Sequence, residues 1–141
     1  MIDTTNKTLQ QVSDEIAKAL IKQGKQCVDS NGDCVYQDDL GNHCAVGFLL
    51  ESGSGIMGYD GSLQPLLSDF EATELGVNGR FLHDNWQALK VIQCIHDAND
   101  RRTAQRNADQ LEKYHNVDVS AWSEWIEARP VKASYNLENY E

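Results

Sequence analysis

The chain has 141 residues, of which 40% are hydrophobic and only two are proline, so it has the size and composition of one globular domain. Its 22 acidic and 12 basic side chains give a formal net charge of −10 at pH 7. Contacts to nucleic-acid phosphates or anionic lipids require Lys or Arg, so this balance argues against direct binding to nucleic acid or membrane. The first residues lack the apolar core of a secretory signal, and no run is long enough to span a membrane. We therefore expect a cytoplasmic protein.

The N-terminal segment predicts an amphipathic helix. Thr8 and Gln11 have the spacing of a capping box, and Gly24 supplies a stop signal. Between them the apolar residues recur at the spacing of one helix face: Leu9, Val12, Ile16, Ala19 and Leu20.

Residues 26–44 predict a small β element. Two β-favouring pieces, Cys27–Val28 and Cys34–Tyr36, are separated by a turn sequence, and a second turn sequence follows them. This pattern predicts an antiparallel hairpin or a three-stranded flap. The segment Cys44–Glu51 is apolar on nearly all sides and predicts a buried helix, and residues 52–62 predict a glycine-rich loop.

The second half of the chain predicts four more helices. Pro65 suits the first turn of one, and residues 81–98 form the strongest, which we expect at the centre of the core. Another covers residues 102–115, and Ser120 is expected to cap a short last helix that ends near Pro130. The predicted fold is α+β but mostly α-helical. It comprises a single domain over residues 1–130, with five or six helices and a β-hairpin or three-stranded flap near residues 26–44, and a polar, flexible tail over residues 131–141.

The catalytic hypothesis concerns Cys44, at the junction of a polar turn and the apolar segment. Backbone amides at a helix N-terminus favour a thiolate. A nucleophilic thiol also needs an imidazole base held by a carboxylate, and His96 with Asp97 or Asp100 supplies these groups. The structural alternative makes Cys44 a small buried hydrophobe, and His96 a core histidine that binds backbone.

A metal site is not expected. In a reducing compartment the four cysteines are expected to be thiols, metal ligands or core residues rather than disulfides. Six residues could in principle supply four soft ligands for zinc: Cys27, Cys34, His43, Cys44, Cys94 and His96. A structural zinc site usually has two ligands two to four residues apart, whereas Cys27, Cys34 and His43 are more widely spaced. The sequence therefore predicts no metal and no other cofactor.

A basic cluster follows residue 100. It is interpreted either as a solvated helix face or as a phosphate site for a small nucleotide, and it consists of Arg101, Arg102 and Arg106.

Three pieces of the sequence carry a resemblance to known proteins: Cys34–Tyr36, the segment Gly41–Gly47 with its apolar continuation, and His96–Asp97. Over roughly residues 7–100 the chain resembles a type of small accessory protein encoded by tailed phages and prophages. This resemblance implies a phage product that acts in the host cytoplasm, and it implies no catalytic residues. The chain departs from that type where the apolar segment meets the glycine-rich loop without a proline-containing turn.

The leading functional hypothesis is a non-enzymatic protein that binds and inhibits a host factor with a basic surface. A nucleic-acid-handling component of antiviral defence would be such a factor, as for an anti-CRISPR protein. The negative charge favours encounter with a basic partner. One alternative is a thiol-dependent hydrolase or transferase at Cys44 and His96, with Asp97 or Asp100. The other is a sponge for a signalling nucleotide at the arginine cluster. Self-association is left open.

Overall fold

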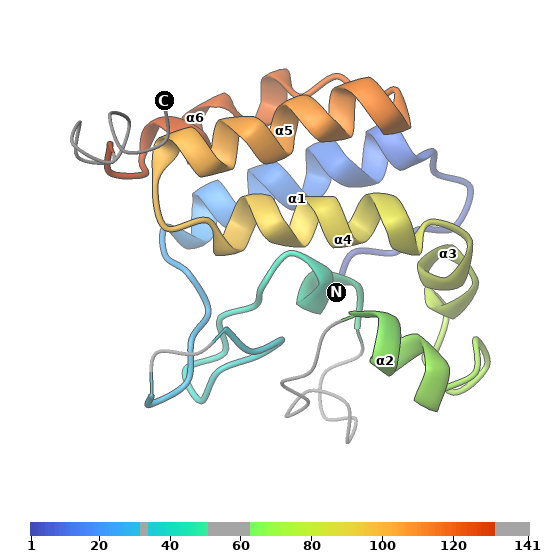
Figure 1. Cartoon of the computed structure of the whole chain (residues 1–141). Coiled ribbons are helices and arrows are strands. Elements are labelled where there is room, and N and C mark those ends of the chain that lie inside the picture. Colours follow the sequence, from blue (N-terminus) through green and yellow to red (C-terminus); the bar gives the residue numbers. More distant parts are fainter. Residues whose placement is uncertain (32–33, 51–62, 132–141) are drawn as a thin grey trace.

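The structure is a computed structural model that describes residues 1–31, 34–50 and 63–131 (Figure 1). Within these ranges the chain is mostly helical, as predicted. The α-helices are α1 (Leu9–Gln23), α2 (Leu63–Asp69), α3 (Gly79–Asp84), α4 (Trp86–Asp97), α5 (Arg101–His115) and α6 (Ser123–Glu127). Two short 3₁₀-helices are η1 (Val46–Leu49) and η2 (Ser120–Trp122). The predicted loop over residues 52–62 and almost all of the predicted tail lie outside the described residues.

α1 begins and ends where the sequence predicts. Thr8 Oγ1 accepts a hydrogen bond from the Gln11 amide at 3.2 Å, and Gln11 Oε1 accepts one from the Thr8 amide at 2.8 Å. At the other end Gly24 has a φ of 79°, and its amide donates to the Leu20 carbonyl at 2.9 Å. These bonds satisfy backbone groups that a helix end would otherwise leave without partners.

α4 is the central helix, as expected for this region. It runs antiparallel to α5, and α1 lies behind this pair (Figure 1). α4 also contacts α2, α3 and η1, while η2 and α6 pack against α1. One buried cluster joins these elements and includes Ile16, Leu49, Ile92, Leu111 and Trp122. Among the described helices, none combines the length and the apolar character needed to cross a lipid bilayer.

The region predicted as one helix over residues 81–98 is instead two helices, α3 and α4. The break is at Asn85, which has a φ of −122° and a ψ of 21°. Its side-chain amide donates to the Phe81 carbonyl at 3.1 Å. Because an Asn side chain that binds nearby backbone competes with the helical pattern, one residue interrupts an otherwise regular apolar repeat.

The predicted buried helix over Cys44–Glu51 is reduced to the single turn η1. Two carbonyl groups that a longer helix would use are bound by other segments. The Phe48 carbonyl accepts from the Ile2 amide at 2.8 Å, and the Leu49 carbonyl accepts from Asn78 Nδ2 at 2.9 Å. Leu50 is therefore extended, with a φ of −100° and a ψ of 144°. These long-range bonds cannot be inferred from the local sequence.

The predicted β-hairpin or three-stranded flap near residues 26–44 is not formed as strands over residues 26–31 and 34–44, which the structure describes. Over the described part of this region the chain has only two isolated antiparallel bridges, Val28 with Cys34 and Gln37 with His43. The chain thus reverses direction as expected, but each ladder is one residue pair long. Side-chain-to-backbone bonds such as those of Asp38 replace the ladder.

The end of the chain also differs in detail. α5 begins one residue before the predicted start, at Arg101, and Asp100 caps it by accepting from the Thr103 amide at 2.8 Å. Ser120 does not cap the last helix. It is the first residue of η2, and Asp118 Oδ1 accepts from its amide at 2.8 Å.

Candidate functional site

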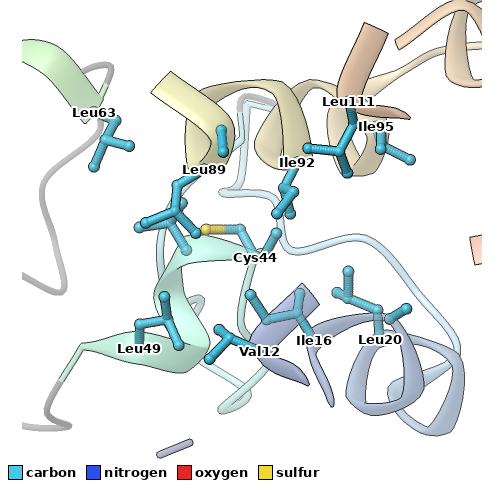
Figure 2. Close-up of a cluster of buried hydrophobic side chains, with 14 of the residues drawn as sticks. Val12, Ile16, Leu20, Cys44, Leu49, Leu63, Leu89, Ile92, Ile95 and Leu111 are labelled. Carbon is cyan, nitrogen blue, oxygen red and sulfur yellow. The ribbon is translucent and has the colours of Figure 1, made fainter. Parts of the chain in front are cut away.

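Cys44 lies in the hydrophobic core. Its side chain is 1% exposed and lies among residues of α1, η1 and α4, including Val12, Leu49 and Leu89 (Figure 2). The Cys44 sulfur accepts a hydrogen bond from the Gly47 amide at 3.2 Å. Burial nevertheless raises the pKa of the Cys44 thiol well above its ordinary value, and the carboxylate of Asp97 contributes in the same direction. The amide of a single 3₁₀ turn does not offset this desolvation.

His96 is fully buried in the last turn of α4. Its Nδ1 lies 2.6 Å from Asp97 Oδ1, and its Nε2 accepts a hydrogen bond from the Cys27 amide at 3.4 Å. The imidazole also stacks on Trp125, with ring centroids 5.6 Å apart. Because the Cys27 amide can only donate, these contacts fit a neutral ring with its proton on Nδ1. His96 therefore holds the segment after α1 against the end of α4.

Asp97 and Asp100, the two carboxylates that the sequence analysis offers as partners of His96, lie in different surroundings. Asp97 lies directly against the ring. The carboxylate of Asp100 accepts from the Thr103 amide at the start of α5, where it acts as the helix cap. Of the two, Asp97 is the carboxylate that orients His96.

The cysteine nearest to this pair is Cys34. One ligand atom from each of Cys34, His96 and Asp97 lies within 4.8 Å of the others. His96 is buried, while Cys34 and Asp97 are half-buried. Sequence reasoning named Cys44 as the partner of His96, and it considered Cys34 only as a zinc ligand, which the residue spacing argued against. The sequence pattern pairs the pieces at 27–28 and 34–36, but it does not indicate that His96 lies against them.

Asp97 connects this cluster to the turn that contains Cys44. Asp97 Oδ1 accepts from Gln93 Nε2 at 3.0 Å, and Gln93 Oε1 accepts from the Val46 amide at 3.0 Å. On the other side, the Cys27 thiol donates to the Asn42 carbonyl at 3.1 Å. Burial, with the nearby charge of Asp38, raises the pKa of Cys27 to about 12. Cys27 and Cys44 are therefore neutral thiols near carboxylates.

The predicted arginine cluster lines one open groove. The groove has a volume of about 580 Å³, and it is lined by Arg101, Arg102, Gln105, Arg106, Asp109 and Val131. Arg101 is held in place because its Nη2 donates to the Glu127 carbonyl at 2.9 Å. Among the described residues, neither Arg102 nor Arg106 takes part in an ion pair.

A second depression lies on residues 26–44, which connect α1 to η1 and are called the turn-rich segment below. It has a volume of about 430 Å³ and is lined by Val28, Asp29, Ser30, Val35, Gln37, Asp38, Asp39 and Leu40. It combines three carboxylates with three apolar side chains. Leu40 is 81% exposed, more than any other described large hydrophobic side chain.

No model of a known protein family, no curated protein and no solved structure matches the chain. The assignment of function therefore depends on the geometry of the thiol–imidazole–carboxylate cluster, the arginine groove and the acidic depression.

Proposed function

We propose that the chain is a non-enzymatic binding protein that docks on a basic protein surface through residues 38–42, here called the docking loop. The observation that supports this proposal is an 81% exposed leucine, Leu40, which directly follows two aspartates and lines the acidic depression with them. Leu40 lines this depression together with Val28 and Val35, and an apolar patch with polar residues around it is typical of a protein interaction site.

The docking loop is held in one conformation by its own hydrogen bonds. Asp38 Oδ1 accepts from the amides of Leu40 at 2.9 Å and Asn42 at 2.8 Å, and Asp38 Oδ2 accepts from Asn42 Nδ2 at 2.8 Å. The Asp38 amide donates to the Asn42 carbonyl at 3.0 Å, and Gly41 adopts a φ of 83°. Leu40 is thus presented without a large loss of loop entropy on binding, which favours affinity.

The chemistry of the depression fits Lys and Arg side chains. Asp29, Asp38 and Asp39 supply negative charge, while Val28 and Val35 supply apolar surface beside it. A Lys or Arg has an apolar stem and a cationic end, so it matches both parts of this lining.

The total charge of the chain does not by itself identify a surface. Exposed carboxylates are distributed over many elements, and they include Asp3, Asp39, Asp69, Glu71, Glu74, Asp84, Asp109, Glu112, Asp118, Glu124 and Glu127. The depression is distinguished by the apolar residues among its acids. The remaining acids contribute to steering a basic partner toward the chain.

The resemblance to phage accessory proteins suggests which partner this is. We propose a host factor of antiviral defence that handles nucleic acid, because such a factor presents a basic surface to phosphates. An acidic protein docked on that surface would exclude the nucleic acid and so inhibit the factor.

This function is tested by quantitative capture from bacterial lysate at low and moderate salt. The variant Asp39→Lys/Leu40→Ser changes the docking loop, and Asp84→Lys/Val77→Ser makes the same changes at exposed positions elsewhere. We expect a basic protein whose recovery falls about 10-fold or more with the first variant and is unchanged with the second. If no captured protein is lost selectively with the loop variant, the proposal is wrong.

A second candidate function is binding of a phosphate-bearing small molecule in the arginine groove. Arg102 and Arg106 are one helical turn apart, and like charges at this spacing destabilise a helix. Cations in the first turn of α5 also oppose the helix dipole. A bound anion would relieve both effects, since guanidinium groups bind phosphate oxygens in pairs.

This candidate is tested by thermal shift with mononucleotides, cyclic dinucleotides and inorganic phosphate. A ligand at 100 times its Kd stabilises by about 2.7 kcal/mol, which shifts Tm by several degrees. The shift should disappear in Arg102→Glu/Arg106→Glu and persist in Arg80→Glu, an exposed arginine on α3. An unchanged Tm with every ligand eliminates this candidate. Thiol chemistry at Cys44 has the least support, because that thiol is buried and neutral.

A further inference from the structure

We propose that Cys34, His96 and Asp97 form a binding site for one thiophilic divalent cation, with Zn²⁺ as the probe. This site is separate from the docking loop and the arginine groove. It consists of one sulfur, one nitrogen and one oxygen ligand whose atoms lie within 4.8 Å of one another. Three protein ligands of this kind leave a fourth position for water or a substrate.

The surroundings favour a cation over a free thiolate. Asp97 lies against the His96 ring, and the charge of Asp38 acts on the nearby Cys27 thiol, so the surroundings are acidic. Among the described residues, the carboxylate of Asp97 is not paired with any Lys or Arg side chain. A divalent cation supplies the positive charge that a thiolate at Cys34 requires.

The ligands are held with different rigidity. His96 is fixed by its burial and by its stacking on Trp125. Cys34 belongs to the turn-rich segment, where it forms an isolated bridge with Val28, and the Val35 amide next to it donates a hydrogen bond to the Cys27 carbonyl at 3.4 Å. Ligands of a tetrahedral zinc lie about 3.3–3.8 Å apart, given bonds of about 2.0–2.3 Å. A movement of about 1 Å by the Cys34 segment therefore brings its sulfur to ligand distance from the other two groups.

Binding changes the protonation of the cluster in a defined way. The Cys34 thiol releases one proton as its sulfur coordinates the cation. The contact of His96 Nδ1 with Asp97 Oδ1, at 2.6 Å, is too short for two ligands of one tetrahedral ion, so this pair must open or Asp97 must use Oδ2. The hydrogen bond from the Cys27 amide to His96 Nε2 is longer, at 3.4 Å. Nε2 is therefore the ring nitrogen that becomes available to the cation more easily.

The argument from residue spacing, which predicted no zinc site, does not apply to this cluster for a physical reason. It considers ligands that are close in sequence, whereas this site combines a turn-rich segment with the end of α4. The two are joined because Gln26 Nε2 donates to the His96 carbonyl at 2.8 Å and the Cys27 amide binds the His96 ring.

The experiment titrates the full, chelator-treated chain with Zn²⁺ against a chromophoric chelator, and with Co²⁺, whose thiolate charge-transfer band reports sulfur ligation. We expect one equivalent bound and the band present. Cys34→Ser should remove the band and weaken Zn²⁺ binding at least about 10-fold, and Asp97→Asn should weaken it about 10- to 100-fold. Cys94→Ser changes an exposed cysteine on α4, the helix that carries His96, and should bind Zn²⁺ as tightly as the original chain does.

Two results would overturn the site. One is the absence of stoichiometric Zn²⁺ binding to the original chain. The other is a Co²⁺ band that persists in Cys34→Ser, which would mean an adventitious ion on another thiol. Circular dichroism of each variant distinguishes lost ligation from lost folding, and Cys34→Ser is suited to this test because the side chain is only half-buried.

Discussion

The sulfur of Cys44 accepts a hydrogen bond from the backbone amide of Gly47 at 3.2 Å, inside the core. The Cys44 amide in turn donates to the Tyr36 carbonyl at 3.2 Å. Cys44 and Gly47 therefore lie where the backbone of η1 packs closely against the preceding turn-rich segment. The motif that most suggested catalysis has a structural role in this arrangement.

Replacing Gly47 by Ala should be strongly destabilising. A Cβ atom at this position would overlap the carbonyl oxygen of Tyr36, and backbone cannot move aside as a flexible side chain does. We expect a loss of about 3 kcal/mol in the free energy of unfolding, measured by urea denaturation. Gly24→Ala is the control, since open space surrounds that position and only its φ of 79° is unfavourable, at about 1 kcal/mol. Equal losses in the two variants would contradict the close approach.

Alkylation of the folded chain should distinguish the four cysteines. Iodoacetamide reacts with thiolates, so exposed Cys94 should be modified well before the buried, neutral Cys44. Peptide mass spectrometry at about pH 8 would give each rate, and urea should bring all four rates together. Modification of Cys44 as fast as Cys94 without denaturant would restore the hypothesis of a reactive Cys44.

The stability of the protein should fall at alkaline pH. The pKa of Cys27 is raised to about 12, and that of Cys44 is raised as well, so both thiols stay protonated in the folded chain. In the unfolded chain a thiol ionises near pH 8.5, so above that pH the unfolded state binds fewer protons and the free energy of unfolding decreases. The slope approaches about 1.4 kcal/mol per pH unit for each thiol. Urea denaturation of Cys27→Ala/Cys44→Ala should show a smaller slope, and an unchanged slope would contradict this assignment.

Asn78 should be a critical polar residue of the core. Its side chain donates to the carbonyls of Ile2 and Leu49, and accepts from the amide and hydroxyl of Thr4. Asn78→Ala leaves these buried groups without partners, and we expect a loss of about 3 kcal/mol. Asn85→Ala, whose side chain donates one hydrogen bond to Phe81, should lose less than about 1 kcal/mol in the same urea assay. Similar losses would mean that the N-terminal segment is not held as described.

The parts of the fold that the sequence predicts are those determined by local interactions. The Thr8 capping box and the Gly24 terminator define α1 because cap and stop act within one turn. The 81–98 region has the same regular apolar repeat, yet a side-chain bond at Asn85 divides it. The η1 turn ends early because Ile2 and Asn78 bind its carbonyls from distant positions.

The candidate sites also differ in whether local sequence or long-range packing determines them. Arg102 and Arg106 are one turn apart on α5, so helical spacing alone brings them side by side in the groove that Arg101 also lines. The juxtaposition of Cys34 with His96 depends on how the turn-rich segment packs against α4, and residue spacing carries no information about that packing.

The central proposal is tested most directly by photo-crosslinking from the docking loop in bacterial cells. A benzophenone side chain replaces Leu40 in one variant and Val77, which is 55% exposed, in the other. We predict that the Leu40 position forms an adduct with one basic protein, that the Val77 position does not, and that Asp39→Lys abolishes the adduct. The same adducts from both positions, or none from Leu40, would contradict a docking function of this loop.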